Sequence, residues 1–225
     1  MRSLPSDGLH VVCHGRWVPC CPPSLPFSHW PFSYASQSDY VIVYQAFNSA
    51  IADYAVEHQR FGGPDYSFER MSWIKPNFTW MMHRCGWASK PGQERVLAIT
   101  IRREHLCSIL EQAVHSSYLP ELYSSHTAWK SELSRSEVRL QWDPDHAPCG
   151  KKLTRRAVQI GLKGEALRLF SSEQIVSIED VTSLCREGAR KLLEGGDVNE
   201  LRVPIERVLE LEPGIQRRIG ADFNL

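Results

Sequence analysis

Hydrophobic and polar positions along this chain fall into short runs of the kinds that strands and amphipathic helices produce. The clearest strand covers residues 95–101, Arg-Val-Leu-Ala-Ile-Thr-Ile, and another apolar run of β-forming residues covers 40–44. Further strands are predicted at 71–74, 137–142, 174–178 and 201–203. The run at 137–142 alternates like a half-exposed strand and is expected to end in a turn at Asp143-Pro144-Asp145.

Helical spacing of apolar residues appears between these strands. The best example carries Leu106, Ile109 and Leu110 on one stripe. Pro76 suits the first turn of a helix that ends near Gly86. Helices are also predicted at 51–58, 157–170, 181–193 and around 208–215. The alternation predicts an α+β fold in which residues 40–225 form a single domain with a split, mostly antiparallel sheet flanked by helices.

Residues 1–39 have a different composition from the rest. They contain six of the fourteen prolines, mixed with serine and without a period. We interpret this segment as a disordered or loosely docked tail.

Composition is informative mainly because it excludes some classes of protein. With 42% hydrophobic and 23% charged residues the chain is typical of soluble globular proteins, and no apolar run approaches the ~18 residues of a membrane helix. Lys+Arg and Asp+Glu are equal at 26 each, so any electrostatic signal must be local. Seven scattered cysteines and no secretory h-region predict an intracellular protein, cytoplasmic or nuclear, without a membrane partner.

The segment 70–84 is the most informative for function. Its fifteen residues hold three cations, two tryptophans and three methionines. A basic, aromatic surface beside a helix start suits a nucleotide-like anion, with Arg70 and Lys75 near the phosphates and Trp73 near a ring. The same residues also fit a hydrophobic core whose cations extend to water. The sequence leaves both readings open.

Three further groups are candidate polar sites. Gln45 and Asn48 follow the first strand, where Asn48 fits a helix N-cap and Gln45 is free to bind a ligand. His146 lies beside two aspartates, which suits acid/base chemistry or a turn. No metal site is predicted, because further ligands at fixed spacing are missing. Glu173 immediately precedes the strand at 174–178, where a carboxylate is either solvated or projects into a cleft.

From residue 40 to about 220 the chain resembles the domain-of-unknown-function 4291 family. Four segments carry the resemblance: Val43-Tyr-Gln-Ala-Phe-Asn48, Arg70-Met-Ser-Trp-Ile-Lys-Pro-Asn-Phe-Thr-Trp-Met-Met82, Val138-Arg-Leu-Gln-Trp-Asp-Pro-Asp-His146 and Arg155-Arg-Ala-Val-Gln-Ile-Gly-Leu162. The family name carries no activity, so function has to be inferred from the residues.

The order of elements is also similar to that of the ADP-ribosyltransferase fold. That resemblance implies NAD as cofactor, with Gln45 where the fold usually has Arg or His, Ser72 as the second-strand serine and Glu173 as the acidic residue. Arg70 and Lys75 would hold the diphosphate, while Trp73 or Tyr44 would stack on a ring. His146 would relay a proton from a nucleic-acid or protein acceptor. This model requires Gln45, Ser72 and Glu173 to converge on one cleft.

A competing hypothesis is a nucleic-acid-binding module without catalysis. The same cations would then contact phosphates, and Trp73 or Trp80 would stack on bases. The basic pairs at 102–103, 151–152 and 155–156 would extend the track. A folded interaction domain with merely solvated basic residues is a third alternative, and the oligomeric state is not predicted.

Overall fold

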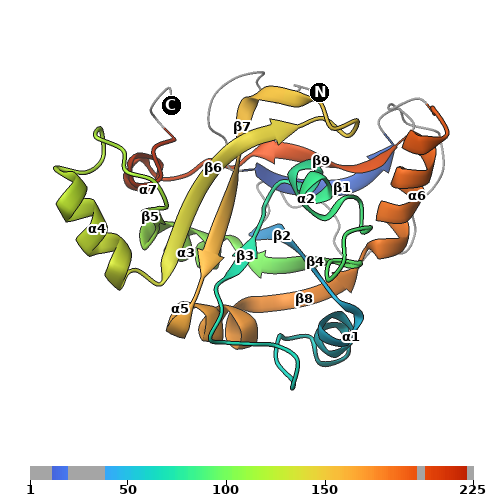
Figure 1. Cartoon of the computed structure of the whole chain (residues 1–225), viewed down its shortest axis with the longest axis horizontal. Coiled ribbons are helices and arrows are strands. Elements are labelled where there is room, and N and C mark those ends of the chain that lie inside the picture. The colour runs from blue at the N-terminus through green and yellow to red at the C-terminus, as the bar shows by residue number, and fades with distance from the viewer. Residues whose placement is uncertain (1–11, 20–38, 197–200, 222–225) are drawn as a thin grey trace.

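The computed structural model describes residues 12–19, 39–196 and 201–221 (Figure 1). Within these ranges the chain forms an α+β fold of mostly antiparallel sheets and surrounding helices. None of the helices in the described ranges has the length and apolar character needed to cross a membrane.

The main sheet is split into a three-stranded and a four-stranded part. The first has the order β2 (Tyr40–Phe47), β4 (Arg95–Arg102), β8 (Ile175–Asp180). The second has the order β3 (Ser72–Ile74), β7 (Lys152–Leu162), β6 (Val138–His146), β5 (Val114–His115). All pairs are antiparallel except β5 with β6. The prediction of a split, mostly antiparallel sheet is confirmed.

One backbone bridge connects the two parts. The Tyr44 N–H donates to the Lys75 carbonyl at 2.8 Å, and the Lys75 N–H donates to the Tyr44 carbonyl at 3.1 Å. The bridge therefore joins two residues that were predicted to lie in the same site.

Helices connect and flank these strands. They are α1 (Ser49–His58), α2 (Phe78–Cys85), α3 (Arg103–Glu111), α4 (His126–Arg135), α5 (Gly164–Leu169), a π-helix η1 (Phe170–Gln174), α6 (Thr182–Leu193) and α7 (Pro213–Arg218). Asn48 caps α1 as predicted, because its Oδ1 accepts from the Ile51 N–H at 3.0 Å.

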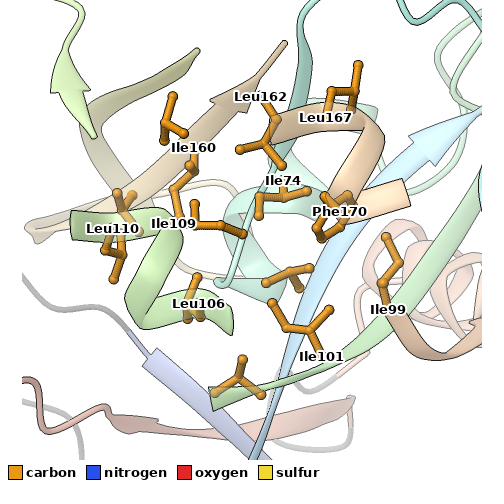
Figure 2. Close-up of a cluster of buried hydrophobic side chains, with 14 of the residues drawn as sticks. Ile74, Ile99, Ile101, Leu106, Ile109, Leu110, Ile160, Leu162, Leu167 and Phe170 are labelled. Atoms are coloured by element: carbon orange, nitrogen blue, oxygen red, sulfur yellow. The ribbon is translucent and has the colours of Figure 1, made fainter. Parts of the chain in front are cut away.

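Two hydrophobic clusters hold the layers together. In the larger one, Ile74 and Ile160 from the four-stranded part meet Ile99 and Ile101 from the three-stranded part, with Leu106 of α3 beside them (Figure 2). In the second, Phe78 and Met82 of α2 pack on Tyr44 and Val96 of the three-stranded part. Helix α2 is therefore anchored by its apolar face, while His83 and Arg84 on its other side are exposed.

Three local predictions are wrong. Residues 152–162 form strand β7 instead of the start of a helix over 157–170, and helical structure begins only at Gly164. The predicted turn at 143–145 is part of β6, which continues to His146 with a register shift after Pro144. Pro76 precedes the N-cap residue Asn77 and is not in the first turn of α2.

The predicted tail, residues 1–39, lies mostly outside the described residues. Within it, Val12–Pro19 forms β1, which pairs antiparallel with β9 (Arg202–Val208) as a separate two-stranded sheet.

Candidate functional site

Polar side chains gather on the face of the four-stranded part that points away from the main core. Ile74 and Ile160 are paired and face that core, so their neighbours Trp73 and Gln159 stand on the opposite face. Gln159 pairs with Gln141 on β6, and Asp143 lies two residues further along the same strand. We call Trp73, Lys75, Gln141, Asp143 and Gln159 the Trp73–Asp143 face.

Asp143 is held by two neutral amides. Its Oδ1 accepts from Gln141 Nε2 at 2.9 Å, and its Oδ2 accepts from Gln159 Nε2 at 2.7 Å. The side chain is half-buried, and the two donors come from adjacent strands. Both carboxylate oxygens are therefore oriented by groups that do not neutralise the charge.

Lys75 is a buried cation with few partners. It is 7% exposed, and its ammonium donates to the Trp73 carbonyl at 3.2 Å. Burial lowers the pKa of Lys75 to about 8, assisted by the charge of Arg84 and opposed by Cys85 and Asp143. Most copies are therefore still protonated at neutral pH, at a cost in desolvation.

Trp73 lies over a glycine of the neighbouring strand. Gly161 is paired with Trp73, and a Cβ on Gly161 would lie 3.0 Å from the indole and 2.6 Å from the Met71 sulfur. The absence of a side chain at position 161 lets the half-buried indole lie flat against β7.

Gln45 and Ser72 meet on the other side of the sheet. Gln45 Nε2 donates to Ser72 Oγ at 2.7 Å, with Gln45 only 3% exposed. The Gln45 Oε1 has no hydrogen-bond partner among the described residues. These two predicted site residues are brought together, on the face opposite to Trp73 and Lys75.

The remaining predicted site residues lie elsewhere. Tyr44 is fully buried and packs edge-on against Phe78, with ring centroids 5.3 Å apart. Arg70 is exposed before β3, and Glu173 is exposed on η1. Within the described residues no hydrogen bond or ion pair joins Glu173 to Gln45 or Ser72. The predicted roles of these residues stay predictions.

His146 is buried beneath α2. Its ring stacks on His83 with centroids 3.6 Å apart and on Trp80 at 5.3 Å. Its Nδ1 has no partner among the described residues. No group of three or more His, Cys, Asp and Glu side chains in the described ranges could hold a metal ion.

Sequence reasoning missed a buried acidic pair next to this site. Asp145 is fully buried and accepts from Arg155 Nε at 2.6 Å. Glu206 Oε1 accepts from the Phe78 N–H at 2.8 Å, and Arg155 Nη2 lies 3.8 Å from its other oxygen. Burial, and then the charge of Asp145, raises the pKa of Glu206 to about 7. The local sequence gave no signal for Glu206, because the pair forms only when β9 meets α2.

The predicted basic track is interrupted. Arg155 is committed to Asp145, Arg156 Nη1 donates to the Trp142 carbonyl at 3.3 Å, and Arg103 bonds the Glu210 carbonyl. Lys151 and Lys152 are exposed at the β6–β7 turn. A continuous strip of free cations through 102–103, 151–152 and 155–156 is therefore absent from the described part of the chain.

Comparison with known proteins identifies the family. The model of the family described as domain of unknown function (DUF4291) matches residues 34–209, so the chain belongs to that family. This confirms the resemblance drawn from the four sequence segments. No curated protein matches the chain.

Proposed function

We propose that this member of the DUF4291 family binds a nucleotide-like anion at the Trp73–Asp143 face and uses NAD for ADP-ribosyl transfer. Trp73 supplies a ring surface, Lys75 a positive charge for the diphosphate, and Asp143 a fixed carboxylate. The backbone bridge between Tyr44 and Lys75 supports this location, because it fixes the cation where the two parts of the sheet meet.

The observation that carries the proposal is a fixed carboxylate on the same face of the sheet as a buried ammonium. Asp143 is oriented by two amides, and its charge raises the pKa of Lys75 against the effect of burial. A buried ammonium with a single carbonyl acceptor stabilises a fold less than an apolar side chain of similar volume. An anionic ligand would provide the negatively charged partner for the Lys75 ammonium that the fold does not provide.

The reaction needs a carboxylate of this kind. When the nicotinamide–ribose bond breaks, its electron pair leaves with nicotinamide and positive charge develops on the ribose. The acceptor then bonds to the ribose carbon and gives up a proton. A carboxylate about 4 Å away, at an effective dielectric near 20, stabilises that charge by about 4 kcal/mol, or about a thousandfold in rate.

Asp143 and Glu173 are alternative candidates for this role. Asp143 is held rigidly on β6, whereas Glu173 lies on the π-helix, a type of element that often occurs at functional sites. His146 remains the candidate for the acceptor's proton, because its Nδ1 has no partner among the described residues.

The test combines NAD binding with transfer. The full chain is titrated with NAD in a thermal-shift assay and then incubated with labelled NAD and a mixture of nucleic acid and protein. We expect NAD to raise the melting temperature and label to be transferred. Asp143→Asn should keep the shift and lose about a thousandfold in transfer rate.

Two further variants control this experiment. Asp65→Asn removes an exposed carboxylate outside the site and should leave transfer unchanged. Glu173→Gln should also leave it unchanged if Asp143 is the essential carboxylate. The absence of both a thermal shift and transfer in the unmodified chain would refute the enzyme hypothesis.

A further inference from the structure

A cavity lies between α2, the β6–β7 turn and the end of α6. Its volume is about 340 Å³. Met82 and His83 of α2, Trp87 after it, and Pro148 and Cys149 of the turn line it, and none of the described lining residues is acidic. It shares no lining residue with the Trp73–Asp143 face.

The cavity wall carries an indole fixed by a strained loop. Trp87 and Ala88 have φ of 54° and 66°, values that non-glycine residues rarely adopt and that cost about 1 kcal/mol or more each. The Trp87 ring packs edge-on against Phe78 with centroids 6.0 Å apart, and a Cβ on Gly188 would lie 2.5 Å from it. The loop therefore holds an aromatic surface rigidly at the cavity.

A second ring is fixed in the same wall. His83 stacks on the buried His146 with ring centroids 3.6 Å apart and an interplanar angle of 11°. Planar ligands stack favourably on such surfaces because their faces complement aromatic rings.

Cations surround this wall on two sides. Arg84 follows His83 on α2, and Lys152 is paired with His146, the residue on which His83 stacks. Burial lowers the pKa of His83, and the charges of His146, Lys90, Arg84 and Lys152 lower it further. Lys90 is anchored there, because its ammonium donates to the carbonyl oxygens of Arg84 at 2.6 Å and His83 at 3.4 Å. Lys152 approaches from β7, and all three cationic side chains are exposed.

We propose that this cavity binds one base of a single-stranded nucleic acid, with the flanking phosphates contacted by Arg84, Lys90 and Lys152. The rings receive the base, and cations on both sides of the cavity suit a backbone that continues past it in each direction. A paired base in a duplex is stacked and cannot enter. The inference goes beyond the proposed NAD site.

The test is binding of a labelled 15-nucleotide oligothymidylate to the full chain, without NAD, by fluorescence anisotropy at several salt concentrations. The double variant Arg84→Ala/Lys152→Ala changes two exposed side chains. We expect about tenfold weaker binding and a salt slope smaller by about 1.4, from two lost phosphate contacts. Cys149→Trp, at the exposed turn, fills the cavity and should weaken binding as strongly.

The matched control is Lys130→Ala/Arg135→Ala. Both residues are exposed on α4, at the opposite end of the molecule from α6 (Figure 1). This variant should bind like the unmodified chain. Because the assay contains no NAD, it tests this site separately from the proposed NAD site. Equal losses of binding in Arg84→Ala/Lys152→Ala and in Lys130→Ala/Arg135→Ala would refute the site. So would duplex binding as tight as single-strand binding, or binding of AMP without any binding of the oligonucleotide.

Discussion

Replacement of Lys75 by methionine tests whether this residue is present for the fold or for a ligand. Methionine has a similar length and no charge, so it removes the cost of keeping an ammonium in a site that is only 7% exposed. If Lys75 were present for folding, its replacement should destabilise the protein. We expect the opposite result.

The magnitude follows from the pKa of the ammonium. The pKa of Lys75 falls from 10.5 to about 8 on folding, and a difference of about 2.5 units corresponds to about 3 kcal/mol of unfavourable free energy when both states are protonated. Loss of the bond to the Trp73 carbonyl offsets about 1 kcal/mol of this. Lys75→Met should therefore be more stable by about 2 kcal/mol at pH 7, which raises the melting temperature by about 4–8 °C.

At higher pH the stability difference between Lys75→Met and the unmodified protein should shrink without changing sign. Between pH 8 and 10.5 the unfolded chain binds more protons at this lysine than the folded chain does, so the stability of the unmodified protein rises. The advantage of the variant should shrink across that range. Urea unfolding of both proteins at pH 7 and pH 10 measures it, with Lys130→Met on the exposed face of α4 as control. A loss of stability in Lys75→Met at pH 7 would refute the reasoning.

Two other predictions concern the surroundings of the site. Glu206, with a pKa raised to about 7, makes the fold lose stability as pH rises from 4.5 to 7, by up to about 3 kcal/mol. Glu206→Gln should flatten that dependence in urea unfolding measured from pH 5 to 8, and an unchanged slope would contradict the assignment. Gly161→Ala places a Cβ 3.0 Å from the Trp73 ring and should displace the indole, with a stability loss of about 1–3 kcal/mol and weaker NAD binding in a thermal-shift titration. An unchanged affinity would show that the indole does not contact the ligand.

Elements with a clear apolar pattern were predictable, whereas the fully buried end of β7 was not. Residues 40–44 and 95–101 lie in buried strands as expected. Residues 157–162 were predicted as part of a helix, but they form the end of β7, and all six are buried. A short buried segment of this kind is hard to distinguish from a buried helix by sequence alone. Asp143-Pro-Asp145 has turn chemistry locally, and pairing with β7 overrides it.

The candidate site was predictable only where its residues are close in sequence. Trp73 and Lys75 came from one basic, aromatic segment. Gln45 contacts Ser72, whereas the convergence of Glu173 with these two residues stays a prediction. The contact of Gln159 with Asp143 depends on the register of β6 against β7, which the sequence does not specify. Glu206 reaches α2 through a strand 128 residues from Phe78, and such long-range pairing has no local signal.

The central claim is that the Trp73–Asp143 face binds a diphosphate nucleotide through Lys75. Isothermal titration of NAD into the full chain, compared with Lys75→Met and Lys130→Met, tests it most directly. The account predicts binding by the unmodified chain, at least tenfold weaker binding by the folded Lys75→Met variant, and no change in Lys130→Met. Equal affinity in all three proteins, or no binding to the unmodified chain, would contradict it.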